Sequence, residues 1–522
     1  MQRRDVLKLG LASGLAGFSP LSSDVPAEER KLLSGAVYNR LPQWRGFNLL
    51  EKFNGRNNRF VEDDFRWISG FGFNFVRLPM DYRMWIKDND WRKIDERVLD
   101  EIDEAVQFGE KYGIHVNINF HRAPGYTVAK PAEPKSVWTD TEALEVCLLH
   151  WRTFAKRYKG VSNDLVSFNL FNEPDRVEPV LAQCVAAHKA IIKGIREEDS
   201  NRLIICDGYE WGNKPFFDLA DQKVAQATRG YVPMEISHYK ASWIGVDNWA
   251  DHPVPAWPFI SGNGLLLSDS KREIKEEFRG ALVISGLFPN KTKLRLKVGT
   301  VSGTTSFVVL AGGKTIFEHQ FKPQAGEGEW KTAVFKKEWN IYQNIYDRDY
   351  ETVIPAGTQN LEFRVTQGDW LTLKQLAVWS ENAKQETVVH LLPDWQQPPA
   401  KFQYRELERK AELTGNVKDK TWLRNRLEAW KKLQEQGCGV MVGEFGAHSL
   451  CPHDVVLCWL ADCLENWREA GWGYALWNFR GGFGVMDSER TDVNYENFHG
   501  HKLDRKMLKL LQGNSQEVAN KR

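Results

Sequence analysis

Two glutamates stand directly after short apolar runs that are typical of buried strands. Glu173 comes just after VSFNLF, which ends at Phe171, and Glu444 follows GVMVG, which ends at Gly443. Two carboxyl groups facing each other suit cleavage of a glycosidic bond, because one protonates the leaving oxygen while the other attacks the anomeric carbon. Polar and aromatic side chains occupy the ends of the neighbouring runs: Arg77, His121, Asn172, His238 and Trp477.

The runs that end in these residues alternate with amphipathic helical stretches. We predict helices over Asp95–Tyr112 and Glu142–Tyr158, and a last one from Lys502 to Leu511. Alternation of this kind is typical of βα units around a parallel sheet. The predicted strands are WRGFN, FNFVR, HVNINF, VSFNLF, LIICD and MEISH, the last ending at His238, followed much later by GVMVG and GYALW.

A long all-β region interrupts the alternation of strands and helices. From about Ser261 to Trp379 the chain reads as strand after strand, and helical sequence is expected again from Tyr404 to Gln436. Six strands before this region and two after it predict an α/β fold: a (β/α)8 TIM barrel with a jelly-roll-like sandwich inserted after strand six. The predicted segments are a leader at 1–30, barrel at 36–260, sandwich at 261–395 and barrel at 396–515.

Such a barrel brings the carboxyl ends of all its strands to one mouth, where the reacting groups of barrel enzymes lie. Glu173 follows the fourth strand and Glu444 the seventh, so they are expected on opposite sides of that mouth. Each residue alone also fits a structural role: a strand-end arginine can be a surface charge, and Asn-Glu-Pro can cap a helix. Together, at the ends of different strands, they favour a catalytic site.

Six short motifs, in order along the chain, resemble glycoside hydrolase family 5, the cellulase-like family of (β/α)8-barrel glycosidases. They are FVRLP at 75–79, NFH at 119–121, FNEP at 171–174, SHY at 237–239, GEFG at 443–446 and ALWNF at 475–479. The resemblance implies that Glu173 is the acid/base and Glu444 the nucleophile of a retaining mechanism, with carboxyl groups about 5 to 5.5 Å apart.

The resemblance also assigns roles to the side chains around the glutamates. Asn172 would bind the sugar 2-hydroxyl, and Arg77 would lie against Glu444 and favour its ionised form. His121 and His238 would position the substrate, and Trp477 would form the stacking floor for the sugar.

One position departs from the family pattern. The family has His, any residue, then Tyr after strand six, with the phenol bonded to the nucleophile, whereas here Tyr239 directly follows His238 and Lys240 comes next. Strand alternation would turn Tyr239 away from the face of His238 unless the chain bulges there. Either Tyr239 is redirected in this way, or Lys240 or another residue replaces the phenol.

Further substrate contacts are expected from loops after the strands. Trp211 follows strand five, and Asp487 lies in a polar loop after strand eight. Both also fit a solvated loop, and the aromatic residues of the sandwich fit either sugar binding or a wall beside the cleft.

Charge and composition limit the partners. Lys and Arg number 70 and Asp and Glu 69, which argues against a nucleic-acid or anionic membrane partner. The 21 tryptophans offer flat apolar faces for sugar rings. We expect a polysaccharide or oligosaccharide substrate, a monomer, and neither a cofactor nor a metal ion.

Arg3 and Arg4 precede a mildly apolar run that resembles a twin-arginine export signal, so a periplasmic or extracellular location is expected. The seven cysteines show no C-x-x-C spacing, which disfavours a disulfide framework but leaves open a bridge from Cys451 to Cys458 or Cys463.

Several functions remain open. The preferred one is an endo-β-1,4-glucanase-like activity, and β-mannanase or exo-β-1,3-glucanase activity comes next. A barrel that binds carbohydrate without cleaving it would not require two opposed carboxylates. A metal-dependent hydrolase is disfavoured because the strand ends lack an HxH pair or a carboxylate cluster.

Overall fold

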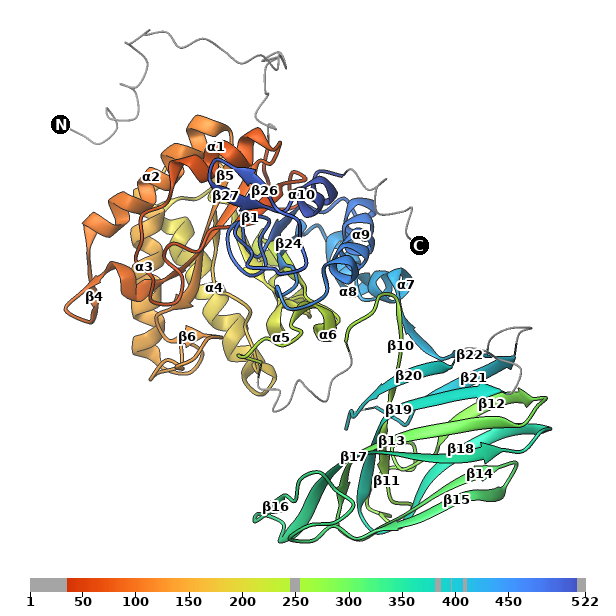
Figure 1. Cartoon of the computed structure of the whole chain (residues 1–522). Coiled ribbons are helices and arrows are strands. Elements are labelled where there is room, and N and C mark those ends of the chain that lie inside the picture. Colours follow the sequence, from red (N-terminus) through yellow and green to blue (C-terminus); the bar gives the residue numbers. More distant parts are fainter. Residues whose placement is uncertain (1–34, 245–253, 381–385, 396, 407–410, 514–522) are drawn as a thin grey trace, which may run out of the picture.

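The computed structural model describes residues 35–244, 254–380, 386–395, 397–406 and 411–513. A closed barrel of eight parallel strands with surrounding helices forms one part of the molecule (Figure 1). Its strands are β1 Arg45–Asn48, β2 Phe75–Asp81, β5 His115–Ala123, β7 Val166–Asn169, β8 Ile204–Asp207, β9 Ala225–Gly230, β24 Val440–Phe445 and β25 Tyr474–Leu476. β1 pairs with both β2 and β25, which closes the cylinder. The predicted barrel is confirmed.

The sixth barrel strand is β9, and the prediction that MEISH forms it is wrong. Met234–Ser237 is the short helix α6, and His238 follows that helix. β9 pairs with β8 on one side and with β24 on the other. Its sequence, AQATRG, contains Gln, Thr and Arg in place of the apolar residues that identify a buried strand.

The helices follow the strands on the outside of the barrel. Predicted helices at Asp95 and Glu142 are confirmed as α2 and α3, and the aspartates before them cap their first turns: Asp95 accepts from Arg97 N and Asp140 from Ala143 N. The helices are α1 Glu62–Gly70, α2 Glu96–Tyr112, α3 Thr141–Arg157, α4 Leu181–Glu198, α5 Tyr209–Gly212, α7 Lys420–Asn425, α8 Glu428–Glu435, α9 His453–Glu469 and α10 Arg505–Leu511.

Short elements fill the connections. The 3-10 turns are η2 Tyr82–Trp85, η3 Glu178–Val180 and η4 Phe217–Gln222. Small strands are β3 Ile86–Lys87, β4 Asp90–Ile94, β6 Tyr126–Thr127, β26 Glu496–Phe498 and β27 His501–Leu503.

Two packed sheets make up the inserted sandwich. One has the order β16-β17-β13-β19-β20-β10-β23, with β11 on β19, and the other β15-β14-β18-β12-β21-β22. The strands are β10 Phe259–Asn263, β11 Leu265–Leu267, β12 Leu282–Phe288, β13 Thr292–Ser302, β14 Thr305–Ala311, β15 Lys314–Phe321, β16 Phe335–Lys336, β17 Ile341–Ile354, β18 Thr358–Gln367, β19 Trp370–Ser380, β20 Thr387–Leu392, β21 Lys401–Glu406, β22 Ala411–Thr414 and β23 Asn416–Lys418. Leu294, Leu296, Phe307 and Phe363 lie in an apolar core separate from that of the barrel.

The expected return to helix at Tyr404 is wrong, because the sandwich continues to Lys418. β21 pairs with β12 and β22, and β23 pairs with β10. Phe402 and Tyr404 alternate with exposed Lys401, Gln403 and Arg405, which is the period of a half-buried strand. Tyr404 stacks on Phe288 with ring centroids 3.9 Å apart. The first helix after the sandwich is α7, which begins at Lys420.

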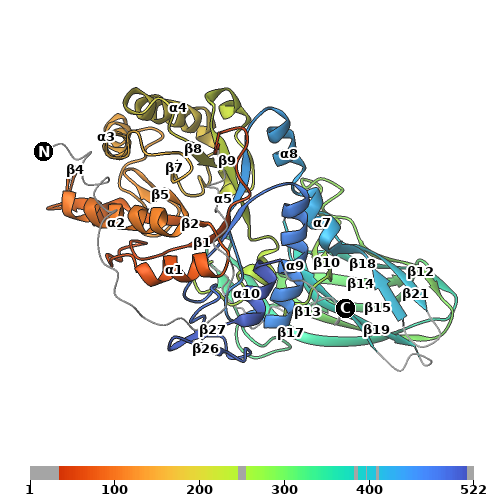
Figure 2. The ribbon, with the colours of Figure 1, turned by 90° about the horizontal axis from the view of Figure 1, so that it is seen from above.

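The sandwich lies to one side of the barrel, and the chain leaves and re-enters through β10 and α7 (Figures 1 and 2). Lys418, the last residue of β23, donates to Glu235 of α6 at 2.7 Å. Its ammonium group also lies 5.1 Å from the ring centroid of Phe259 and 5.5 Å from that of Trp422. Through these contacts Lys418 joins the segment that leaves the barrel, which contains α6 and β10, to the segment that returns to it through α7.

The predicted leader at 1–30 lies outside the described residues. Among the residues that the structure describes, none of the helices is both long and apolar enough to span a membrane. All seven cysteines are within the described ranges and are thiols, so Cys451 forms no bridge to Cys458 or Cys463.

Aromatic side chains fill the space between strand β5 and helix α3. Trp151 of α3 is fully buried and stacks on Phe120 of β5, with ring centroids 3.8 Å apart. Phe154 and Phe168 pack against the same indole. This cluster fixes the helix that follows the third strand to the barrel wall.

Replacement of Trp151 by alanine is expected to lower the free energy of unfolding of the barrel by about 3 to 5 kcal/mol, because it leaves a cavity in a packed core. Denaturant unfolding followed by tryptophan fluorescence and circular dichroism measures the change. Trp339→Ala is the matched control, since that indole is 64% exposed and its removal should change stability by about 0.5 kcal/mol or less. Equal effects of the two substitutions would contradict the packing argument.

Candidate active site

Glu173 and Glu444 lie at the carboxyl ends of the barrel strands, within one buried polar network. Glu444, near the end of β24, is 3% exposed, and Glu173 follows β7. The Glu444 carboxylate accepts hydrogen bonds at Oε1 from Arg77 Nη1, at 2.5 Å, and at Oε2 from Tyr231 Oη, at 3.2 Å. The strand order therefore brings together carboxyl groups from opposite parts of the sequence.

Arg77 is fully buried and all of its guanidinium nitrogens have acceptors. Nε donates to Asn169 Oδ1 at 2.9 Å, Nη1 to Asn48 Oδ1 at 3.0 Å, and Nη2 to Asn172 Oδ1 at 2.7 Å. These contacts, from β1, β7 and the segment after β7, fix the guanidinium against Glu444. Asn172 Nδ2 is buried and has no hydrogen-bond partner, which leaves a donor inside the network.

A second buried arginine, Arg229 at the end of β9, contacts both glutamates. Its Nε donates to Glu173 Oε1 at 2.7 Å, and its Nη2 lies 3.4 Å from Glu444 Oε1. Nη2 also donates to Asn172 Oδ1 at 3.1 Å and to Asp207 Oδ2. One side chain thus bridges the two carboxyl groups that the sequence singled out.

Asp207, the last residue of β8, completes the network. It is fully buried, and its Oδ2 accepts the main-chain N–H of Glu173 at 3.0 Å. Its Oδ1 accepts from Asn169 Nδ2 at 2.9 Å. Arg229 was not predicted from the sequence, because the sixth strand was expected in another segment. Asp207 had no predicted role, although this residue ends a predicted strand.

Burial raises the pKa of Glu173 to about 8, with the negative charge of Glu444 as the second cause and Arg229 acting in the opposite direction. Burial likewise lowers the pKa of His121 well below its usual range, and Arg77 and Arg229 add to that effect. Burial and the charge of Glu444 raise the pKa of the Tyr231 phenol. At neutral pH the site therefore holds a protonated Glu173, a neutral imidazole and a neutral phenol.

The phenol bonded to Glu444 is Tyr231, and the assignment of Tyr239 to the site is corrected. Tyr239 is 4% exposed and packs in the apolar core of the barrel, with Lys240 Nζ 5.1 Å from its ring centroid. Tyr231 comes two residues after Arg229 at the end of strand six, so the spacing of the family's His-x-Tyr motif recurs in Arg229-Gly230-Tyr231 with arginine in place of histidine. The misplaced strand accounts for the missed phenol.

His238 lies behind Tyr231 and hydrogen-bonds Ser237. Its ring centroid is 5.1 Å from that of Tyr231, and its Nδ1 is 2.8 Å from Ser237 Oγ. Burial lowers the pKa of His238 to about 4, with a smaller contribution from His448. His238 therefore contacts the Tyr231 ring from the residue after α6 and does not stand at the end of a strand.

Trp477 and His121 form an aromatic group with Phe53. The Phe53 ring lies 4.6 Å from His121 and 5.2 Å from Trp477, in edge-on contacts, and the His121 and Trp477 centroids are 5.9 Å apart. Phe53 belongs to the loop after β1 and was missed by the sequence analysis. Trp477 remains half-buried and follows β25, at the same end of the barrel as the glutamates.

The two loop residues occupy different surroundings. Trp211 is 43% exposed in the turn α5, after β8. Asp487 accepts from Arg480 Nη1 at 3.1 Å and Lys502 N at 2.9 Å, and lies 2.9 Å from His501 Nδ1. These contacts fasten the loop after β25 to the hairpin β26–β27, so the structure gives Asp487 a role in holding the loop.

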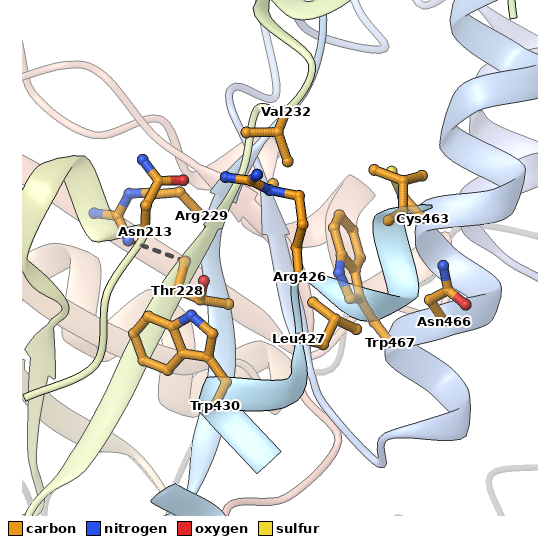
Figure 3. Close-up of a pocket in the computed structure, with 12 residues that line it drawn as sticks. Asn213, Thr228, Arg229, Val232, Arg426, Leu427, Trp430, Cys463, Asn466 and Trp467 are labelled. Atoms are coloured by element: carbon orange, nitrogen blue, oxygen red, sulfur yellow. Dashed lines mark hydrogen bonds between the residues drawn. The ribbon is translucent and has the colours of Figure 1, made fainter. Parts of the chain in front are cut away.

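Two cavities have linings that include neither Glu173 nor Glu444. A cavity of about 40 Å³ behind β9 is lined by Thr228, Arg229, Arg426, Trp430 and Trp467 (Figure 3), and it is too small for a sugar ring. A larger one of about 690 Å³ is lined by residues at the amino-terminal end of the barrel, including Arg45 and Asn74. Because barrel chemistry takes place at the carboxyl ends of the strands, neither cavity competes with the mouth as the candidate site.

A titration tests the predicted acidity of Glu173. In protein labelled with ¹³C at the glutamate carboxyl groups, one resonance should titrate near pH 8, and it should be missing from Glu173→Gln. Glu444→Gln should move that titration to lower pH, because it removes a negative charge that disfavours ionisation of Glu173. A Glu173 resonance that titrates at the ordinary value of a glutamate would contradict the assignment.

Comparison with known proteins finds a family model that matches the first part of the barrel. Residues 35–238 match the family model of cellulase (glycosyl hydrolase family 5), a range that includes Glu173 and ends before β24. Endoglucanase C of Acetivibrio thermocellus is 29% identical over 187 residues, which cover 35% of this chain and 53% of that protein. Cellodextrinase A of Ruminococcus flavefaciens is 29% identical over 198 residues, 36% of this chain and 56% of that protein.

The chain thus spans about half the length of the curated relatives that it matches. A crystal structure of a glycoside hydrolase superposes with a TM-score of 0.57 at 24% identity, covering 90% of this chain and 99% of that one, which shows the shared fold. The match to glycosyl hydrolase family 5 thus covers residues 35–238, which contain the first six barrel strands.

Proposed function

We propose that the protein is a retaining β-glycoside hydrolase in which Glu444 is the nucleophile and Glu173 the acid/base. The observation that carries the proposal is the unequal environment of two glutamates in one network. Glu444 receives hydrogen bonds from Arg77 and Tyr231, whereas burial raises the pKa of Glu173 to about 8. Pairs of carboxyl groups with separated acidities are typical of glycosidase sites.

In the first displacement, Glu444 forms a bond to the anomeric carbon while the bond to the leaving oxygen breaks. Glu173 gives its proton to that oxygen, so the aglycone departs neutral. In the second, Glu173 takes a proton from water, the water oxygen attacks the anomeric carbon, and the ester to Glu444 breaks. Two inversions leave the anomeric configuration unchanged, and contact of one guanidinium with both carboxyl groups supports the short spacing that this mechanism requires.

The surrounding side chains suit a sugar in this position. Asn172 Nδ2 is an unused buried donor, and a bond to the 2-hydroxyl would satisfy it. Trp477 offers a half-buried aromatic face next to His121, against which the C–H face of a sugar can stack.

The substrate class proposed is a β-linked glucan or its oligosaccharides. The names of the relatives, an endoglucanase and a cellodextrinase, support β-1,4-linked glucose before mannan or β-1,3-glucan. A polymer too large to enter a cell also agrees with the export predicted from Arg3 and Arg4. A panel of polysaccharides and aryl β-glycosides, with product stereochemistry followed by ¹H NMR, identifies the linkage and distinguishes retention from inversion.

The inserted sandwich offers a second contact with the polymer. Trp395 is 57% exposed and stands edge-on to Trp370, with ring centroids 5.4 Å apart. Exposed indoles of this kind can stack on sugar rings. Trp395→Ala should weaken adsorption to insoluble glucan and leave hydrolysis of an aryl glycoside unchanged if the sandwich binds the polymer.

Substitution of either glutamate by glutamine tests the proposal. Glu444→Gln should lower kcat on an aryl β-glycoside by about 10⁴-fold or more, since no nucleophile remains. Glu173→Gln should lower hydrolysis of a poor leaving group by about 10² to 10⁴-fold, with a smaller loss for 2,4-dinitrophenol, which departs without a proton. Glu178→Gln is the control, because that side chain is 57% exposed. Retained hydrolysis in Glu444→Gln would instead favour a carbohydrate-binding barrel with a contaminating activity.

Two tyrosines provide a matched pair. Tyr231→Phe should lower kcat about 10-fold or more, because a hydrogen bond to a charged group contributes about 1.5 to 3 kcal/mol. Tyr239→Phe, at the tyrosine that the sequence analysis named as one candidate, should stay within about twofold of the parent. Loss of activity in Tyr239→Phe alone would reverse the assignment of the phenol.

A further inference from the structure

Arg229 occupies a slot that the backbone leaves open for it. A Cβ atom on Gly212 would come within 2.6 Å of Arg229 Cγ, and one on Gly443 within 2.8 Å of Arg229 Nη1. Gly443 directly precedes Glu444, so the same tight segment that presents this glutamate also makes room for the guanidinium. The side chain is thus confined by Gly212 at the end of α5 and by Gly443 in β24, and its direction is set before any substrate binds.

The planar guanidinium distributes its donors among different partners. Nε is directed at Glu173 Oε1, whereas Nη2 contacts Asp207, Asn172 and Glu444, and Nη1 donates to Thr228 O at 3.3 Å. A lysine ammonium has the charge but not this fork, so it could not serve all of these acceptors from one position. The contacts therefore depend on the shape of the arginine as well as on its charge.

Asp207 holds both partners of the contact between Arg229 and Glu173. Its Oδ2 accepts the main-chain N–H of Glu173 at 3.0 Å and also accepts from Arg229 Nη2. The backbone of Glu173 at φ +50° and its carboxyl oxygen Oε1 are thereby tied to the same pair of side chains. The remaining oxygen, Oε2, is then the one available to a glycosidic oxygen.

We propose that Arg229, held by Asp207, is a positioning residue that fixes Glu173 Oε1, reserves Oε2 for the transferred proton, and stabilises the Glu173 carboxylate in the second displacement. The inference rests on the proposed function. It goes beyond that function because it assigns to Arg229, at the end of β9, the orientation and the ionisation of the acid/base Glu173.

The charges around Glu173 explain how one residue serves both displacements. Before reaction, burial and the negative charges of Glu444 and Asp207 favour the protonated acid, and Arg229 opposes them. Once Glu444 is esterified its charge is gone, while Arg229 stays in contact with Glu173 Oε1. The balance then favours the carboxylate, which is the form that takes a proton from water. The facing charged and titratable groups are Arg229 from β9, Asp207 from β8, Glu444 from β24, Arg77 from β2, Tyr126 from β6 and Tyr231 after β9.

The experiment measures the pH dependence of kcat/KM on an aryl β-glycoside with a poor leaving group. Its alkaline limb reports the acid form of Glu173 in the free enzyme. Arg229→Met removes a positive charge and should shift this limb up by about one pH unit, whereas Asp207→Asn removes a negative charge and should shift it down by a similar amount. Arg229→Lys keeps the charge, so its limb should stay close to that of the parent although its rate falls.

A second readout separates the two displacements. With 2,4-dinitrophenyl glycosides the first step needs no proton, so kcat reports the second step, in which Glu173 is the base. Arg229→Met should lower this kcat about 10-fold while kcat/KM changes little, so KM falls as the intermediate accumulates. A purely structural loss would lower both quantities together and leave the limb in place.

Each outcome decides the inference. The inference is overturned if the alkaline limb of kcat/KM stays at the parent's pH in both Arg229→Met and Asp207→Asn while their circular dichroism spectra match that of the parent. If Arg229→Met does not fold, an alkaline limb in Asp207→Asn at or above that of the parent overturns it alone. Glu173→Gln separates the causes: if that variant is inactive and the limbs are unmoved, only the role of Arg229 fails, whereas a fully active Glu173→Gln removes the proposed function and this inference with it.

Discussion

Burial of two arginines among three carboxyl groups is the constraint on which the site depends. Arg77, Arg229, Asp207 and Glu444 are each between 0% and 6% exposed, and Glu173 lies between them. Buried charges are tolerated only when each has partners at close range, and loss of one partner leaves the other uncompensated. The network therefore joins the strand ends at the mouth of the barrel and is also the candidate catalytic apparatus. Its members come from β2, β8, β9, β24 and the segment after β7, so it forms only when these strand ends meet.

The inserted sandwich does not disturb this buried network, because the sandwich lies outside the barrel. β9 and β24 are neighbours in the sheet although Arg229 and Glu444 are 215 residues apart in the sequence. The sandwich has its own apolar core, and the chain leaves and returns through β10 and α7, which are joined by Lys418 (Figures 1 and 2). The insertion between β9 and β24 thus leaves the pairing of these two strands intact. The mouth of the barrel is therefore lined by residues that precede the insertion and by residues that follow it.

Where the sequence analysis failed, local pattern and tertiary environment disagreed. MEISH was predicted as a strand from its apolar residues but forms α6. AQATRG lacks the apolar pattern of a buried strand but forms β9. Its polar residues are accommodated because the barrel interior there is lined by polar groups that hydrogen-bond one another. Because of the same error Tyr231 was not considered, and the phenol was left open between Tyr239 and a replacement by Lys240 or another residue. Around Tyr404 the opposite happened, because helix was expected where the chain forms β21, in which Phe402 and Tyr404 face the sandwich core and Lys401, Gln403 and Arg405 are exposed.

The sequence by itself determined the barrel, the insertion after six strands and the two glutamates, because these follow from period, order and motifs that are local along the chain. Tertiary structure decided which side chains surround them. Arg229, Asp207, Tyr231 and Phe53 join the site through contacts between segments that are distant in sequence. The raised pKa of Glu173 also arises there, because burial and neighbouring charge are properties of the folded arrangement and of no single segment.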